Sequence, residues 1–398
     1  MNSKQEHSMK QSPALWAISA LAAAILTACG GTVAPQQASP VAQAASTVAA
    51  TAENLRTPQV QQQAVAPALY ELAYSARQNA VFVASAGGFG EGAASSKVLR
   101  LNPQTLAVEA EIALPHRSFG VVLDDAANRL YVGNSLEGSI TVLDTRSHAI
   151  VATVPMVTPT QKDDGKTSFE HHFRELVLDT ANHRLFAPGL SSKDSALYVL
   201  DTQNLKLEKV IPGLGQVATG VAFDAKGQRL FVSNLRGGLY EIDTRSLSIR
   251  QSHAVQADQL LNLALDAQGQ RLFATDQGLD AISERRKKAE PEFQPTPGNR
   301  VVVFNPDTAA ITASIPTGNG PIALLLDEPR HRLFVTNRGA GTVTVFDSRD
   351  YRLLHTIELP AHPNSLALDA AHNVLYVTVK NGRDAARGSA ESVARIAF

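Results

Sequence analysis

The stretch VAFDAKGQRLFV, which runs from Val221 to Val232, decides the fold because the chain repeats it. It consists of an apolar–x–apolar–Asp segment, a polar turn of five residues and a Leu–aromatic–Val segment. Five further copies begin at Val121, Leu176, Leu263, Leu324 and Leu366, and a degenerate copy, LAYSARQNAVFV, begins at Leu72. Two alternating strands joined by a short polar turn form an antiparallel hairpin. Seven spaced copies predict a repeat architecture.

Each hairpin is followed by two more short strands. The third strand ends in Asp or Asn, as in ITVLD at 140–144, and the fourth follows a polar turn, as in YRLLHTIEL at 351–359. Four short strands per unit, which we name A to D, are typical of a propeller blade. We therefore predict an all-β fold, a seven-bladed β-propeller.

The last blade is one strand short. Its third strand ends at Phe398, and Gln59–Ala66 is the one unassigned segment before the first blade. Pairing these two segments removes two exposed strand edges. We predict that the N-terminal strand closes the last blade.

The N-terminal region predicts export. Residues 1–28 have a weakly basic start and an apolar run of sixteen residues, Pro13 to Ala28, which is typical of a signal peptide. The run ends in LTACG, which resembles a bacterial lipobox, so we expect Cys29 to be lipidated and to anchor the chain in the membrane. The alternative is an ordinary signal peptide in which Cys29 is incidental. Gly30 favours the periplasmic side of the outer membrane if the source is Gram-negative.

Composition separates a tether from the folded domain. Residues 29–58 are rich in Ala, Gln, Ser and Thr and carry little charge, which predicts a flexible tether before the propeller at 59–398. Cys29 is the single cysteine, so no disulfide is expected. The net charge is −1 for the full chain and, without Lys4, Glu6 and Lys10, −2. This balance provides no bulk attraction for nucleic acid.

The residues that exceed a minimal four-stranded blade are predicted to lie on one face of the propeller. The B–C loops and the D–A links lie on the same face of a propeller, opposite the A–B and C–D turns. The four insertions beyond a minimal blade fall in these loops and links: 85–97, 156–170, 277–300 and 380–391. Because function concentrates in elaborated loops on a rigid scaffold, we expect the functional site on this face.

Several A strands begin with polar residues, which are predicted to lie at the mouth of the central channel. Five residues before the Asp position of each repeat the chain has Tyr70, Phe119, Arg174, Thr219, Leu261, Ile322 and Asn364. Four residues before it the chain has Glu71, Gly120, Glu175, Gly220, Asn262, Ala323 and Ser365, and His171 and His172 lie just upstream of Arg174. Polar groups at apolar strands need partners. Water and mutual pairing, or a ligand at the channel mouth, would supply them.

A basic run lies on the same face. Arg285, Arg286, Lys287 and Lys288 are consecutive, and neighbouring B–C loops are predicted to add the further cations Lys380, Arg383, Arg387, Arg236 and Arg338. The run predicts an anionic ligand or, alternatively, a solvated surface. The repeated Asp-x-x-x-x-Arg of the A–B turns is instead interpreted as turn chemistry, in which Asp accepts backbone N–H bonds.

Motifs for catalysis are scarce. No G-x-S-x-G, phosphate loop or Cys/His metal spacing occurs, and adjacent His171 and His172 on a strand would point to opposite faces. We therefore predict no enzyme and no cofactor. The alternative is a metal-dependent hydrolase or lactonase with Glu71, Glu175 and Asn262 as an oxygen-rich calcium-type site.

The phrases LFVTN at 333–337 and LFVSN at 230–234 resemble the YVTN family of β-propeller repeats. Within it, YELAYS at 70–75, RELV at 174–177, HPNSLAL at 362–368 and RIA at 395–397 resemble the YncE-like periplasmic propellers. The resemblance implies binding rather than catalysis, with single-stranded DNA as ligand. The expected function is a cell-envelope propeller lipoprotein that binds single-stranded DNA, another anionic polymer or a peptide through its B–C/D–A face.

Overall fold

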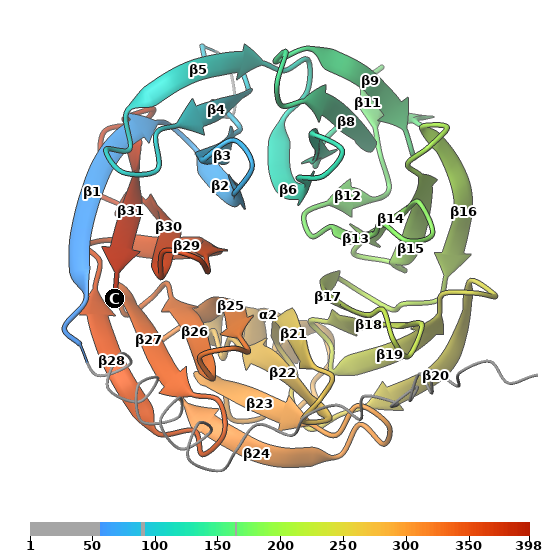
Figure 1. Ribbon diagram of the computed structural model, residues 1–398. Coiled ribbons are helices and arrows are strands. Elements are labelled where there is room, and N and C mark those ends of the chain that lie inside the picture. The colour runs from blue at the N-terminus through green and yellow to red at the C-terminus, as the bar shows by residue number, and fades with distance from the viewer. Residues whose placement is uncertain (1–55, 89–91, 164) are drawn as a thin grey trace, which may run out of the picture. The chain divides into compact units, whose positions relative to one another are not determined.

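The computed structural model describes residues 56–88, 92–163 and 165–398. The predicted signal peptide, Cys29 and nearly all of the predicted tether lie outside the described residues. Seven sheets stand around a central opening, each with its innermost strand at the opening and its outermost strand at the rim (Figure 1). The predicted seven-bladed β-propeller is confirmed.

Six blades follow one another along the chain, in the strand order A to D. Blade 1 contains β2 (Leu69–Ser75), β3 (Ala80–Ser85), β4 (Lys97–Leu101) and β5 (Val108–Ala113). Blade 2 contains β6 (Ser118–Asp124), β7 (Arg129–Asn134), β8 (Ser139–Asp144) and β9 (Ile150–Pro155). Blade 3 has a divided first strand, β12 (His172–Phe173) and β13 (Val177–Asp179), followed by β14 (Arg184–Leu190), β15 (Ala196–Asp201) and β16 (Lys206–Pro212).

The second half repeats the pattern. Blade 4 contains β17 (Ala218–Asp224), β18 (Arg229–Asn234), β19 (Gly238–Asp243) and β20 (Ser248–Ala254). Blade 5 contains β21 (Leu260–Asp266), β22 (Arg271–Asp276), β23 (Arg300–Phe304) and β24 (Ile311–Pro316). Blade 6 contains β25 (Pro321–Asp327), β26 (Arg332–Asn337), β27 (Thr342–Asp347) and β28 (Leu353–Glu358).

The two ends of the propeller meet in blade 7. It contains β29 (His362–Asp369), β30 (Val374–Lys380) and β31 (Glu391–Ala397), and its outer strand is β1 (Gln59–Ala66). β1 and β31 run antiparallel, with Gln59 opposite Ala397 and Ala66 opposite Glu391. The predicted closure by the N-terminal strand is confirmed, and Figure 1 shows the first strand of the domain at the rim beside the last.

The repeated phrase builds turns and core. Its aromatic position is at most 2% exposed in every blade, at Phe82, Tyr131, Phe186, Phe231, Phe273, Phe334 and Tyr376. Between blades 3 and 4, for example, Phe186 packs in one cluster with Val221 and Leu230. Burying an aromatic side chain stabilises a fold by roughly 1.5–3 kcal/mol, so these seven positions hold neighbouring blades together.

The A–B turns confirm the interpretation of the Asp position. Asp124, Asp224 and Asp266, for example, each accept a backbone N–H from the residue three positions on. The residue four positions after each Asp or Ser anchor has a positive φ, between 45° and 56°, at Asn79, Asn128, His183, Gln228, Gln270, His331 and Asn373. The Arg of the pattern forms an ion pair with its own Asp at Arg229, Arg271 and Arg332. The pattern is therefore structural.

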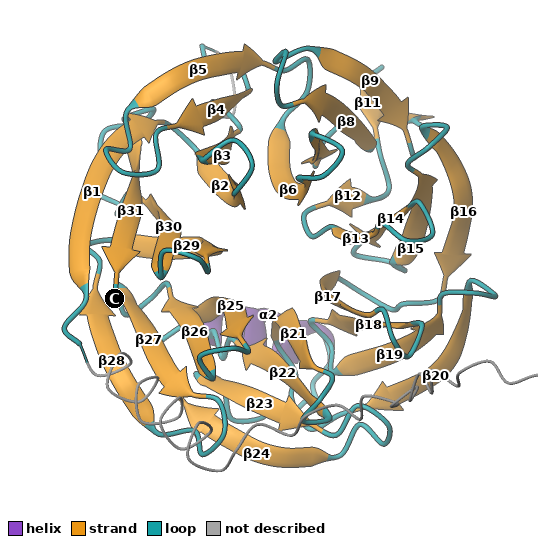
Figure 2. Cartoon of the chain, in the orientation of Figure 1, coloured by secondary structure: helices purple, strands orange, loops and turns teal. Residues whose placement is uncertain are grey.

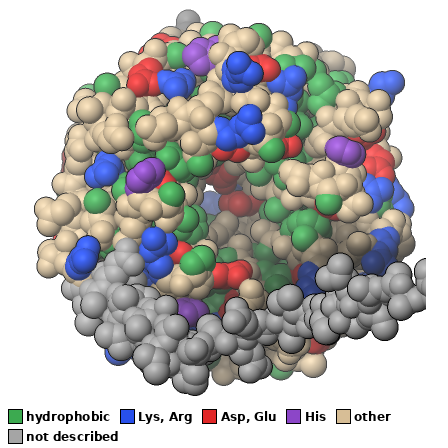
Figure 3. Space-filling view, in the orientation of Figure 1, with side chains coloured by type: hydrophobic (Ala, Val, Ile, Leu, Met, Phe, Trp, Pro, Cys, Tyr) green, Lys and Arg blue, Asp and Glu red, His purple; other side chains and the backbone are tan. Residues whose placement is uncertain are grey.

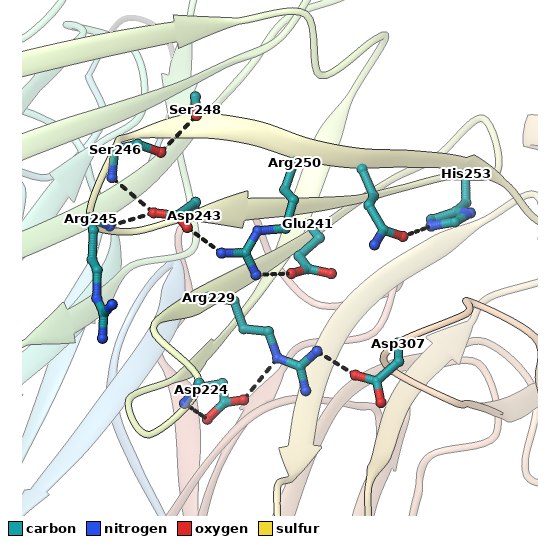
Figure 4. A network of polar contacts seen from close by, with 12 residues as sticks. Asp224, Arg229, Glu241, Asp243, Arg245, Ser246, Ser248, Arg250, His253 and Asp307 are labelled. Atoms are coloured by element: carbon teal, nitrogen blue, oxygen red, sulfur yellow. Dashed lines mark hydrogen bonds and ion pairs between the residues drawn. The ribbon is translucent and has the colours of Figure 1, made fainter.

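Some of these arginines also tie neighbouring blades together. Arg229 bonds Asp224 in its own turn and Asp307 in the C–D turn of blade 5, at 2.9 and 2.5 Å (Figure 4). On the outer strand of blade 4, Arg250 bridges Glu241 and Asp243. These links lie on blade bodies and turns, away from the long loops.

Two insertions of the loop face have structure of their own. The D–A link before blade 3 forms a hairpin of β10 (Thr160–Gln161) and β11 (Thr167–Ser168), and the B–C loop of blade 5 contains α2 (Asp280–Ala289). Figure 2 shows α2 behind β21 and β25 in this view. This helix was not expected from the sequence. Among the described residues no helix has the length and apolar character needed to cross a membrane.

Candidate ligand site at the channel mouth

The A strands bulge at the two positions that the sequence alignment singled out. In blade 1 the pairing of β2 with β3 skips from Leu69 to Leu72, which leaves Tyr70 and Glu71 off the ladder. The same interruption occurs in blades 2, 4, 5, 6 and 7, and in blade 3 the strand breaks between Phe173 and Val177. A bulge redirects side chains away from the sheet. Here it turns them toward the channel.

A cavity of about 290 Å³ lies at this mouth. Its lining includes all seven residues five positions before the Asp anchors, together with Glu71 and Glu175. Leu235, Gln277, Ile282 and Arg338, from the B–C loops, complete the wall and place the cavity on the predicted face. Its volume is at the small end of ligand pockets. We call it the mouth cavity.

Two arginines in the mouth cavity lack acidic partners. Among the described residues, the guanidinium groups of Arg174 and Arg338 have neither an ion pair nor a hydrogen bond to the protein. Burial lowers the pKa of Arg174, and the positive charge of Arg338 close by also lowers it. Two like charges held in one cavity favour binding of an anion.

An aromatic pair lines the cavity beside these cations. The rings of Tyr70 and Phe119 stand 3.9 Å apart between centroids, at 30°, and Arg174 lies 5.3 Å from the Phe119 ring. On its other side Tyr70 meets Lys380, whose Nζ lies 4.1 Å from the ring. Leu261, Ile282 and Ile322 add aliphatic surface. The cavity therefore combines an anion site with a flat, apolar wall.

A carboxyl pair lies deeper in the channel, where acidic side chains are visible in the central opening (Figure 3). Burial raises the pKa of Glu175 to about 7, although hydrogen bonds from Glu71 and Asn262 oppose the rise. Burial and the Glu175 carboxyl hold the pKa of Glu71 well above its usual range. Two carboxyls in contact cannot both ionise readily. Each carboxyl therefore keeps its proton to a higher pH than an exposed glutamate does.

Two of the three channel groups also connect adjacent blades. Glu71 accepts the backbone N–H of Val121 in blade 2, at 2.9 Å, and Asn262 accepts that of Leu324 in blade 6, at 3.0 Å. Since the Asn262 oxygen is occupied, its amide N–H₂ is what remains for Glu175. Mutual pairing thus accounts for these polar groups, and a cation at this point would have to displace an inter-blade bond.

The histidines are directed elsewhere. His171 bonds the Tyr198 hydroxyl and the carbonyl of Asp194, at 3.0 and 2.9 Å, whereas His172 bonds the carbonyl of Ser135. The two side chains thus point to different neighbours, and the mouth cavity is lined by other residues. Asn364, by contrast, lies in its wall as the alignment predicted.

The basic run is divided between exposed and paired side chains. It lies on α2, where Arg286 bonds Glu290 and stacks 3.9 Å from the centre of the Phe293 ring, and Lys287 bonds Glu284. Arg285 and Lys288 are exposed. Half of the expected charge is therefore neutralised.

Lys380 differs more sharply from expectation. The sequence suggested an exposed loop cation, but Lys380 ends β30, is 9% exposed and bonds Glu391 at 3.0 Å. It also donates to the carbonyl of Leu69 at 2.6 Å, and Glu391 accepts the N–H of Leu69. The expectation was wrong because the neighbouring strand β31 supplies Glu391 to the end of β30, and the ring closure brings Leu69 of β2 against both side chains.

Several curated proteins have sequences similar to that of this chain. Two proteins named uncharacterized protein YncE, from Escherichia coli O157:H7 and Escherichia coli K12, are each 31% identical over 322 residues, 80% of this chain and 84% of their own length. The chain belongs to the YncE family. A Salmonella typhimurium protein of the same name is 28% identical over 373 residues, 88% of this chain and 94% of its own. No family model matches the chain.

The carboxyl pair predicts a pH dependence of stability in this YncE-family propeller. The folded state holds the proton of Glu175 with a pKa of about 7, above the ordinary 4.5 of the unfolded chain. Stabilisation by this group is therefore complete below pH 4.5 and is lost as the pH rises through 7. We expect the free energy of unfolding to fall by roughly 1–3 kcal/mol from pH 5 to pH 8.

Urea unfolding at both pH values, with Glu175→Gln as the comparison, tests this dependence. The variant keeps the size of the side chain but cannot titrate, so its stability should change less between the two pH values. An equal fall in the variant and the parent protein would assign the effect to other groups.

Proposed function

We propose that this YncE-family protein is a binding protein rather than an enzyme, and that its ligand presents an anionic group to the mouth cavity. The observation that carries the proposal is the pair of guanidinium groups, Arg174 and Arg338, that face one cavity without an acidic partner among the described residues. The Tyr70–Phe119 pair and the aliphatic wall suit a flat or apolar group attached to that anion.

Single-stranded DNA, another anionic polymer and a peptide all contain such an anion. The mouth cavity would accept the anionic group of any of these ligands, whether that group lies at the end of the ligand or along it. The exposed Arg285 and Lys288 on α2 add a weaker positive field on the same face. A hydrolase centred on Glu71, Glu175 and Asn262 has less support, because Glu71 and Asn262 already accept backbone N–H groups of the neighbouring blades.

The envelope location predicted from residues 1–29 is part of the proposal. A lipid anchor at Cys29 would leave the propeller on a tether at the membrane surface. Incorporation of labelled palmitate into the parent chain but not into Cys29→Ser is the measurement that checks it.

Substitution of the two arginines tests the function itself. We expect Arg174→Gln and Arg338→Gln each to weaken binding of an anionic ligand by about tenfold or more, since a hydrogen bond to a charged group contributes about 1.5–3 kcal/mol. Calorimetric titration with acetyl-leucine, acetyl-phenylalanine and a twelve-nucleotide oligothymidine provides the measurement.

The double variant Arg285→Ser/Lys288→Ser is the matched control, because it removes two cations from the same face outside the mouth cavity. It should change affinity little. Equal losses in the control and in the cavity variants would assign binding to the general surface charge. Absence of binding by all three probes would contradict the proposed function.

A further inference from the structure

A second cavity continues from the mouth cavity between blades 7 and 1. It has a volume of about 390 Å³ and lies between the B–C loops of these two blades. Tyr70 lines both cavities and so stands at their junction. Its walls are mostly small residues and main chain: Pro67, Ala68, Gly87, Gly88, Gly382, Ala385, Ala386, Gly388 and Ser389. We call it the seam groove.

The chemistry of the seam groove differs from that of a nucleic-acid channel. Sequence-tolerant binding of single strands relies on a basic track and on aromatic rings that stack successive bases. Among the described residues that line the groove, Tyr70 is the one aromatic, and Lys380 is neutralised by Glu391. Arg387, which also lines it, has an interaction of its own within the protein. A chain in the groove would meet mainly glycine, alanine and backbone.

The two cavities together match the two parts of one ligand. The mouth cavity offers two cations beside an apolar wall, which suits a single terminal anion with an apolar side chain. The seam groove is lined mainly by Gly, Ala and Ser residues, whose small side chains leave room for an extended chain. The Glu71–Glu175 carboxyls, which line both the mouth cavity and the next pocket down the channel, disfavour a second negative charge.

We propose that the ligand is a linear peptide with a free C-terminal carboxylate. The carboxylate binds Arg174 and Arg338, the last side chain packs against Leu261, Ile282 and Ile322, and the preceding residues pass Tyr70 into the seam groove. This inference rests on the proposed function, because it specifies the ligand of the same mouth cavity.

Three probes and the purified full-length protein test it. The probes are a hexapeptide that ends in a leucine carboxylate, the same hexapeptide with a C-terminal amide, and acetyl-leucine. We expect the acid to bind at least tenfold more tightly than the amide, since the amide lacks the negative charge that pairs with the two arginines. Acetyl-leucine should bind more weakly than the hexapeptide because it leaves the groove empty.

Gly382→Leu enlarges a residue that lines the seam groove and lies outside the lining of the mouth cavity. A Cβ at Gly382 would meet just the Ala361 Cβ, at 3.9 Å, so the backbone accepts the change. The variant should lower the affinity for the hexapeptide acid to that for acetyl-leucine and leave the latter unchanged. Ala225→Leu, an exposed A–B turn substitution on the opposite face, should change neither.

The outcomes separate the two proposals. Equal binding of the acid and the amide, or a hexapeptide affinity that Gly382→Leu leaves unchanged, overturns the peptide inference while anion binding stands. Binding of oligothymidine without the hexapeptide acid also overturns it in favour of a nucleic acid. Failure of every anionic probe contradicts the proposed function as well.

Discussion

Lys380→Met lowers the free energy of unfolding by about 3–5 kcal/mol, the cost of leaving one member of a buried ion pair without its partner. Lys380 and Glu391 have side chains that are 11% and 12% exposed and lie 3.0 Å apart. Both also bond the backbone of Leu69, through its carbonyl and its N–H. The substitution thus removes an ion pair and a bond that holds the start of blade 1 to blade 7.

Denaturant unfolding of matched variants measures this effect. Lys193→Met breaks the exposed pair with Glu170, whose side chains are 78% and 36% exposed, and should cost only about 0–1 kcal/mol. The double variant Lys380→Met/Glu391→Gln should be less destabilised than the sum of its single changes, because no buried charge is left unpaired. If Lys380→Met lowers the free energy of unfolding as little as Lys193→Met does, water must hydrogen-bond to the Glu391 carboxylate in place of Lys380, and the prediction is wrong.

Removal of β1 opens the ring. β1 contributes seven register pairs to β31, and at roughly 0.5–1.5 kcal/mol for each net hydrogen bond its loss costs on the order of 5 kcal/mol. Little of this comes from apolar burial, since most of β1 is exposed and Ala66 is its one buried residue. A chain that begins at Pro67 should therefore unfold at much lower temperature than one that begins at Arg56.

The exposed edge of β31 is also expected to associate with other chains. Thermal unfolding and light scattering of the two truncations measure both effects. A synthetic peptide of residues 56–66, added to the shorter chain, should restore part of the lost stability by occupying the edge. Equal stability of the two truncations would show that β1 is not needed for closure.

The repeat predicted more of the site than its individual residues did. Alignment on the Asp anchor placed Tyr70, Phe119 and Arg174 at the channel mouth, and the structure brings them into one cavity. The alignment succeeded because every blade bulges at the same distance from its A–B turn. By contrast, Arg338 was considered only as a loop cation, since its place in the cavity depends on how blade 6 faces blade 1.

Chain position was a poor guide to charge. Arg286 and Lys287 belong to a continuous basic run, yet on α2 both reach carboxylates one turn away. A signal for α2 existed, because Leu279 and Ile282 are spaced for one helix face and Asp280 precedes the basic residues. The helix start is held by the side chain of Gln259, which bonds the N–H of Leu279 at 2.8 Å. That contact is not visible in the sequence.

The amino-acid sequence by itself determined the number of blades, the strand order within each blade and the closure by Gln59–Ala66. These follow from local patterns, because alternation, turn residues and an unpaired last strand act over a few residues and repeat. Only the tertiary structure decided which charges are free. Lys380 is neutralised by Glu391 against the start of blade 1, Glu71 and Glu175 are buried together, and Arg174 and Arg338 face one cavity without an ion pair among the described residues. Charge pairing depends on distance in space, and the ring brings together residues that lie more than a hundred positions apart, as Glu71 and Glu175 do.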